Sequence, residues 1–170
     1  NLERLLFDLS GCDGARIARF MGDLAGKKRY AIDDAMKAAL QKRYFAGCVD
    51  ENGVREEIRR TWAENHYLMD THTAVASAVL RAYQAQTGDT RQSVIVSTAS
   101  PYKFGASVLG AVAGQKACDG LDYFACCRAL AELTGTREPA QILALPDLPI
   151  RHTAVCEKDK MAQAVLDAVK

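Results

Sequence analysis

The chain has 170 residues, of which 49% are hydrophobic and 25% are charged, and its formal net charge is +1. This is the composition of a globular protein with enough residues for about one domain and a buried core, so a disordered chain is excluded. The basic residues are scattered and the densest run is Lys27-Lys28-Arg29, so a nucleic-acid-binding surface is not expected.

Three helices are predicted before residue 44. Residues 1–9 carry leucines on one face with Asn1 as a helix cap, and residues 13–25 repeat the helical spacing of apolar side chains. Gly26 is expected to end this second helix. A third helix is expected over 33–43.

The middle of the chain is predicted to mix helices with extended segments. Residues 45–49 are expected to form a short strand, and the next helix starts near Val54 after a turn. Asp70 is expected to cap a further helix. Residues 92–99 contain the consecutive β-branched side chains of residues 94–96. Such a run is typical of a parallel strand that is covered on both faces.

The last third is predicted to hold helices over 105–114 and 120–134, a short strand at 153–156 and a final helix over 159–170. One convincing strand among about seven helices needs neighbouring strands to satisfy its backbone N–H and C=O groups. We therefore predict an α/β fold, in which helices flank a parallel sheet whose other strands lie outside this sequence.

No run approaches the roughly 18 apolar residues of a membrane span. The opening residues carry both signs of charge and no cleavage site, so a signal peptide is not expected. Six cysteines follow no C-x-x-C spacing, and a chain of this length does not depend on disulfides. The prediction is free thiols in a reducing cytoplasm, with no metal site.

Four segments carry a family resemblance. They are NLERLLFDLSG at the start, YLMDTHTAVASAV (67–79), VIVSTASPYKF (94–104) and IRHTAVCEKDKM (150–161). In this order and at these distances they resemble the C-terminal half of threonine synthases, over essentially the whole chain. Thr71 departs from the usual proline of the family, and Ser100 with Tyr102 departs from the usual His and Ala.

The resemblance implies a fold-type-II pyridoxal phosphate (PLP) enzyme that converts O-phosphohomoserine and water to L-threonine and phosphate. Residues 1–170 would then be the C-terminal part of the large PLP-binding domain. The Schiff-base lysine and the loop that grips the cofactor phosphate precede this part in the family. The N-terminal half that carries them is therefore an expected partner, and the chain alone is expected to be inactive.

Thr98 is the cofactor-binding residue that the resemblance implies, because the Thr of the family's STA motif donates a hydrogen bond to the pyridine nitrogen. A hydroxyl can do so without requiring that nitrogen to be protonated. Ser97 is the alternative if the register shifts by one residue. Either hydroxyl could instead cap the next turn.

His72 and Lys103 are the candidate substrate-binding residues. His72 lies in the first turn of the helix after Asp70, and helix N-termini bind anions such as the substrate phosphate. Lys103 follows the predicted strand and is expected to face a phosphate or to be structural, since the family's cofactor lysine lies in a different sequence context. A first-turn residue without a ligand is the simpler alternative for His72.

Two other functions stay open. The chain could be a self-standing binding or regulatory module that associates with a partner chain. It could also belong to another fold-type-II PLP lyase, such as a cysteine synthase or threonine dehydratase. In isolation, an apolar strand edge is expected to cause self-association.

Overall fold

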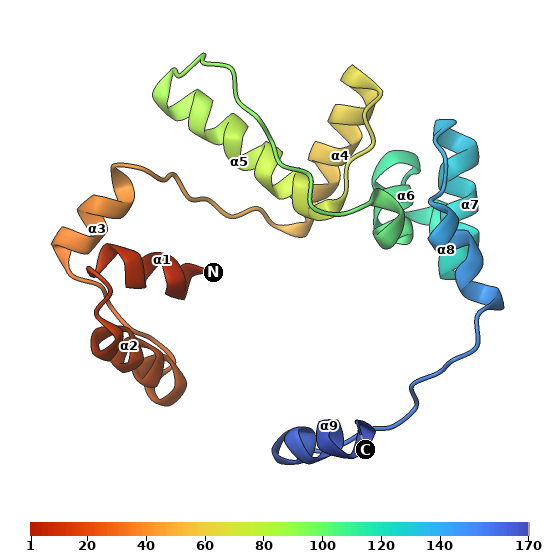
Figure 1. Ribbon diagram of the computed structural model, residues 1–170. Coiled ribbons are helices and arrows are strands. Elements are labelled where there is room, and N and C mark those ends of the chain that lie inside the picture. Colours follow the sequence, from red (N-terminus) through yellow and green to blue (C-terminus); the bar gives the residue numbers. More distant parts are fainter. Residues whose placement is uncertain (170) are drawn as a thin grey trace. The chain divides into compact units, whose positions relative to one another are not determined.

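The computed structural model describes residues 1–169, which form helices joined by extended connectors (Figure 1). The α-helices are α1 (Leu2–Leu9), α2 (Gly14–Lys27), α3 (Asp34–Gln41), α4 (Glu51–Asn65), α5 (Thr71–Thr87), α6 (Gly105–Ala113), α7 (Tyr123–Thr134), α8 (Ala140–Ala144) and α9 (Met161–Ala168). Short 3-10 helices are η1 (Pro101–Phe104), η2 (Gln115–Cys118), η3 (Leu145–Asp147) and η4 (Lys158–Lys160). None of the described helices has the length and apolarity that a bilayer span requires.

The chain divides into two units. The first contains Asn1–Val54 and Val75–Ile95, and the second contains Arg55–Ala74 and the residues from Val96 onward. The boundaries fall inside α4 and α5, so each of these helices contributes to both units.

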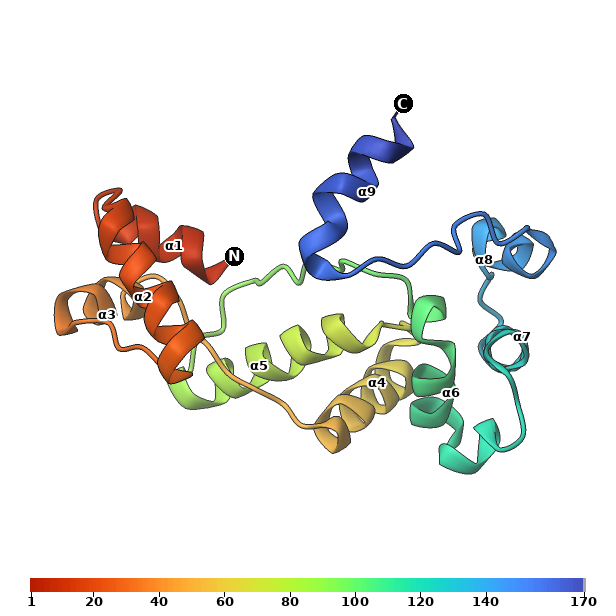
Figure 2. The ribbon, with the colours of Figure 1, turned by 90° about the horizontal axis from the view of Figure 1, so that it is seen from below.

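The core of the first unit lies among α1, α2 and α3, which gather together in Figure 2. It is built from Leu6 of α1, Ile17 and Phe20 of α2, and Met36 of α3, all buried. The ring of Phe20 also stacks on Tyr30, with 5.3 Å between the ring centroids. Burying one such side chain contributes about 1.5–3 kcal/mol to the packing of the three helices.

Aspartates cap α2 and α3. Asp13 and Asp33 each accept a hydrogen bond from the backbone N–H three residues later, at 2.9 and 2.8 Å. This satisfies one of the donors that a helix start leaves unpaired. Asn1 occupies the cap position of α1 but makes no side-chain cap; its side-chain amide oxygen accepts from the Arg4 guanidinium group instead.

The predicted end of the second helix at Gly26 was wrong, because α2 continues to Lys27. Lys28 takes the left-handed conformation, with φ of 60°, and its backbone N–H bonds to Leu24 O. Its ammonium group donates to the carbonyl of Ala25 at 2.9 Å. A lysine therefore does what the glycine was expected to do, since it satisfies carbonyl groups at the helix end.

α4 begins at Glu51, three residues before the expected start at Val54. The cause is Asp50, whose carboxylate accepts the backbone N–H of Gly53 at 2.8 Å. The polar residues predicted to form a turn are thus the cap and first turn of the helix.

In the second unit, α6 and α7 pack closely against each other. A Cβ atom placed on Gly105, at the start of α6, would lie 2.6 Å from Cys127 Sγ. The glycine is therefore required for this approach. Val108, Leu109 and Leu130 complete a buried contact between the two helices.

Tyr102 fastens η1 to this pair of helices. Its ring is buried and its hydroxyl donates to the carbonyl of Thr136 at 3.2 Å. Its own carbonyl accepts from the hydroxyl of Tyr123 at 2.8 Å and from the thiol of Cys127 at 3.3 Å. Packing in the core is thus the role of the tyrosine that departs from the family pattern.

The three predicted strands, 45–49, 92–99 and 153–156, are not strands in residues 1–169, so the structure does not support the expected parallel sheet. Val94 and Val96, expected to be covered on both faces, are 86% and 73% exposed. The physical reason is the shortage of neighbouring strands that the sequence already indicated. An apolar extended segment pairs only when neighbouring strands accept its hydrogen bonds, and the described residues supply none.

Candidate functional site

The site begins at Asp70, a buried carboxylate that caps α5. Its exposed fraction is 0%, and one oxygen accepts the backbone N–H groups of His72 at 2.8 Å and Thr73 at 3.2 Å. The other oxygen accepts from the hydroxyl of Thr73. The predicted cap is confirmed.

The charge of Asp70 is held in place by these bonds. Burial by itself raises the pKa of a carboxyl group, but the hydrogen bonds from the Thr73 hydroxyl and from the backbone N–H groups of His72 and Thr73 outweigh it, and the pKa lies below its ordinary value of 3.8. The carboxylate is therefore ionised at neutral pH, next to the positive end of the α5 dipole.

Thr73 joins this cap to the extended segment that follows α5. Its hydroxyl oxygen lies 3.2 Å from Ser97 Oγ in a hydrogen bond, and Thr73 is only 4% exposed. A hydroxyl can donate one hydrogen bond and accept others, so Thr73 can bind Asp70 and Ser97 together. Ser97 is thereby brought to the N-terminus of α5.

Thr98, the predicted cofactor-binding residue, is exposed and directly follows Ser97. Its side chain makes no hydrogen bond with another residue in the range 1–169. The hydroxyl therefore remains available to an external acceptor, beside a neighbour that is fixed.

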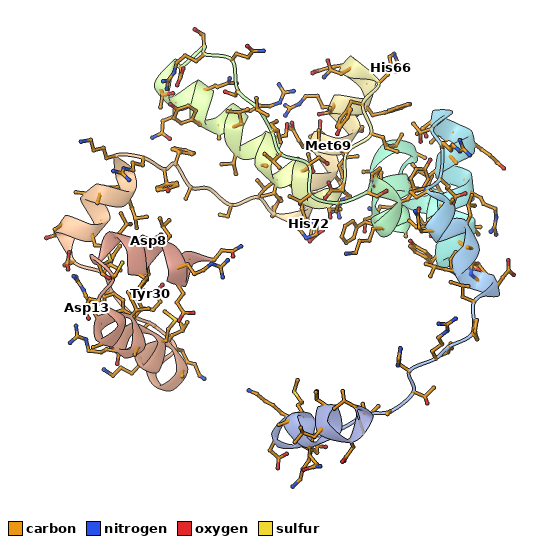
Figure 3. All side chains as sticks on the ribbon, viewed as in Figure 1. Asp8, Asp13, Tyr30, His66, Met69 and His72 are labelled. Carbon is orange, nitrogen blue, oxygen red and sulfur yellow. The ribbon has the colours of Figure 1, made fainter. Side chains whose placement is uncertain are left out.

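His72 projects from the first turn of α5, where Figure 3 labels it. Its side chain is 66% exposed, and Nδ1 lies 3.4 Å from an oxygen of Asp70. Its ring lies 5.0 Å from that of Phe104 between centroids, tilted by 52°. The imidazole is thus oriented by two neighbours and still open to solvent.

Lys103 reaches the same region from η1. It is exposed, and its ammonium nitrogen lies 5.9 Å from the centroid of the Phe104 ring. Ser100 caps η1 by accepting the N–H of Tyr102 at 3.3 Å, and its carbonyl accepts the N–H of Lys103 at 3.0 Å. His72 and Lys103 therefore share one aromatic neighbour.

The structure brings four predicted residues to one place, the start of α5. They are His72, Ser97, Thr98 and Lys103. The sequence reasoning missed Thr73 and Phe104 as the residues that connect them. The D-x-x-T order of residues 70–73 contains the signal for the Asp70–Thr73 pair, but no local pattern indicates the contacts to Ser97 and His72.

The arrangement suits a ligand that carries an anionic group. It offers an available hydroxyl, an exposed imidazole and an exposed ammonium group. These groups can bind and orient a ligand.

No family model matches the chain. Among curated proteins it is similar to threonine synthase-like 2 of Xenopus laevis, with 29% identity over 61% of this chain and 22% of that protein. It is similar to threonine synthase of Pseudomonas aeruginosa, with 29% identity over 68% of the chain and 24% of that protein. It is also similar to human threonine synthase-like 1, with 30% identity over 66% of the chain and 15% of that protein.

One solved structure has the same fold over nearly the whole chain. It is the crystal structure of PLP-bound threonine synthase from Brucella melitensis, with a TM-score of 0.67 and 23% identity. The match covers 99% of this chain and 31% of that one. The chain therefore spans less than a third of the length of each of these relatives.

Proposed function

We propose that this threonine synthase-like chain is the C-terminal part of the PLP-binding domain of an enzyme that converts O-phosphohomoserine and water to L-threonine and phosphate. The observation that carries the proposal is the grouping of Ser97, Thr98, His72 and Lys103 at the start of α5. The likeness to threonine synthases in sequence and in fold supports it.

The hydroxyls at this site fit pyridoxal phosphate. Bound there, the cofactor supplies an electron sink for the reaction. The hydroxyl of Thr98 donates a hydrogen bond to the pyridine nitrogen, for which its lack of a partner among the described residues leaves it free. Ser97 is the alternative donor, but its bond to Thr73 occupies it in part.

His72 and Lys103 bind the phosphate of the substrate in this proposal. Both side chains are exposed and lie near the Phe104 ring. The carboxylate of Asp70 accepts hydrogen bonds from the backbone N–H groups that it caps, and so fixes the first turn of the helix.

The chain alone is expected to be inactive, and its partner is the part of the protein that carries the cofactor lysine. The exposed apolar side chains of Val94 and Val96 support a segment of a larger sheet rather than a self-standing binding module, whose surface would be polar there. The cysteines are free thiols, which supports a cytoplasmic location.

The proposal is tested by exchanging the matching segment of the Pseudomonas aeruginosa enzyme for this chain and measuring phosphate release from O-phosphohomoserine. Release is expected from the exchanged enzyme and not from the 170-residue chain alone. Thr98→Val is expected to lower kcat roughly tenfold or more, as the loss of one hydrogen bond to a polar ligand does, whereas Thr90→Val, a threonine outside the site, leaves it unchanged.

Serine and threonine serve as alternative substrates in the same assay. An exchanged protein that folds and binds the cofactor but acts on these instead of O-phosphohomoserine belongs to another PLP lyase. One that folds and acts on none of them contradicts the proposal.

A further inference from the structure

A cavity lies in the first unit, and its lining residues are all different from those of the site above. It has a volume of about 640 Å³ and lies between the connector after α3 and one face of α5. Figure 2 shows this connector passing beside α5. We call the cavity the connector pocket; Gln41–Phe45, Ala76, Val79, Leu80, Tyr83, Thr87 and Arg91 line it.

The floor of the connector pocket is one face of a regular helix. Ala76, Val79, Leu80 and Tyr83 are spaced three or four residues apart, so they lie in a row along α5. The floor is apolar except at the Tyr83 hydroxyl, which donates to Asp89 at 2.7 Å.

The connector over Gln41–Phe45 forms the opposite wall of the pocket, and close contacts hold it against this floor. A Cβ atom on Gly47 would lie 3.1 Å from a methyl group of Val79, so only a glycine lets the connector run so near the helix. The rings of Phe45 and Tyr83 meet edge to face, with 5.2 Å between centroids. The backbone N–H of Tyr44 bonds to Leu40 O at 2.9 Å, which continues α3 into the wall.

The connector pocket has an excess of positive charge. Lys42, Arg43 and Arg91 line it, and no carboxylate does. Arg91 is neutralised by Asp89, to which its Nε donates at 2.9 Å. Lys42 and Arg43 have no ion-pair partner among residues 1–169, so their charges remain available.

These features together select a class of ligand. Small-molecule sites commonly have volumes of roughly 300–1,000 Å³ with apolar walls and a few placed polar groups. The exposed rings of Tyr44 and Phe45 offer faces and edges to a flat ring. An arginine with unused donors binds phosphate oxygens in pairs.

We propose that the connector pocket binds a planar aromatic phosphate of about the size of a mononucleotide. The ring lies against Tyr44 and Phe45, and the phosphate is held by Lys42 and Arg43. This site shares no residue with the one assigned to the substrate, so it stands whether or not the proposed enzyme activity does.

Calorimetric titration of the chain tests the proposal with four probes: adenosine 5′-monophosphate, pyridoxamine 5′-phosphate, adenosine and orthophosphate. At least one of the two aromatic phosphates is expected to bind at least about tenfold more tightly than adenosine or orthophosphate, because each half of the ligand adds its own contacts. The aromatic phosphate that binds more tightly shows whether the ligand is a nucleotide or a pyridoxal-type compound. Equal affinity for the aromatic phosphates and for orthophosphate would overturn the proposal, as would no binding of either.

Three variants locate the binding. Arg43→Gln is expected to weaken binding of the aromatic phosphate at least about tenfold. Tyr44→Leu is expected to weaken it by a similar factor and to leave orthophosphate binding unchanged. Arg29→Gln removes an exposed cation of the same unit outside the pocket and is expected to have no effect. An equal loss in Arg29→Gln and Arg43→Gln, with far-UV circular dichroism unchanged in both, would mean non-specific attraction and refute the site.

Discussion

The hydroxyl oxygens of Thr73 and Ser97 lie 3.2 Å apart although 24 residues separate them in the sequence. The bond joins the first turn of α5 to the extended segment on which Thr98 lies. Thr73 is itself hydrogen-bonded to the buried carboxylate of Asp70. The cap of α5 therefore fixes the position of Ser97 through Thr73.

Replacing Thr73 with valine keeps the shape of the side chain and removes its hydroxyl. One oxygen of Asp70 then loses its partner while buried, which costs about 1–3 kcal/mol of the free energy of unfolding. Urea denaturation measures this loss, and the backbone of residues 97–99 is expected to become more mobile, which ¹⁵N relaxation measures. Thr73→Ser keeps the hydroxyl and is expected to behave like the wild type. Unchanged ¹⁵N relaxation at 97–99 in the valine variant would show that the bond does not hold the segment.

Asp70 makes the stability of the chain depend on pH in the acid range. Its pKa in the folded state is below the ordinary value of 3.8, so below neutral pH the unfolded state takes up protons first. The free energy of unfolding therefore contains a contribution that is fully present above about pH 5 and is lost as the pH falls through 3.8 and below. Asp70→Asn can still cap the helix but does not ionise, and its urea midpoint is expected to change less between pH 6 and pH 3. Parallel pH profiles of the two proteins would count against this assignment.

Gly105→Ala places a methyl group 2.6 Å from Cys127 Sγ. Overpacking of this kind costs about 1–3 kcal/mol. The second substitution Cys127→Ala removes the sulfur and is expected to recover most of the loss, which thermal denaturation of the single and double variants measures. Gly22→Ala is the matched control, because a Cβ there meets nothing within 4 Å, and it is expected to stabilise α2 by about 0.5–1 kcal/mol. If the double variant is no more stable than Gly105→Ala, the close approach is not the cause.

Val94 and Val96 are expected to cause self-association of the isolated chain, because they are exposed apolar residues on an extended backbone with unpaired polar groups. Sedimentation velocity of a variant with Val94→Lys and Val96→Lys should show a shift toward monomer. Leu148→Lys changes a similarly exposed residue, 55% accessible and outside the segment, and is expected to leave the association state as it is. Equal association of all three proteins would assign the effect to another surface.

The helices could be predicted from the sequence because their signals are local. The apolar spacing of residues 1–9 and the aspartates that precede α2 and α3 act within one or two turns, and the structure has helices at these places. The strand predicted at 92–99 was wrong, because a strand depends on hydrogen-bond partners that the sequence pattern of one segment does not contain. The candidate site shows the same difference between local and long-range contacts. The Asp70 cap could be predicted from adjacent residues, whereas the contacts of Thr73 with Ser97 and of His72 with Phe104 join segments 24 or more residues apart.

Tyr102 has a consequence for motion in the second unit. Its hydroxyl is bonded beyond the end of α7 and its carbonyl to the first residue of that helix. The turn that carries Lys103 is thus attached near both ends of α7. A shift of α7 would also move the backbone of this turn, so a tyrosine at this position couples the proposed anion-binding lysine to a helix that contributes no residue to the site.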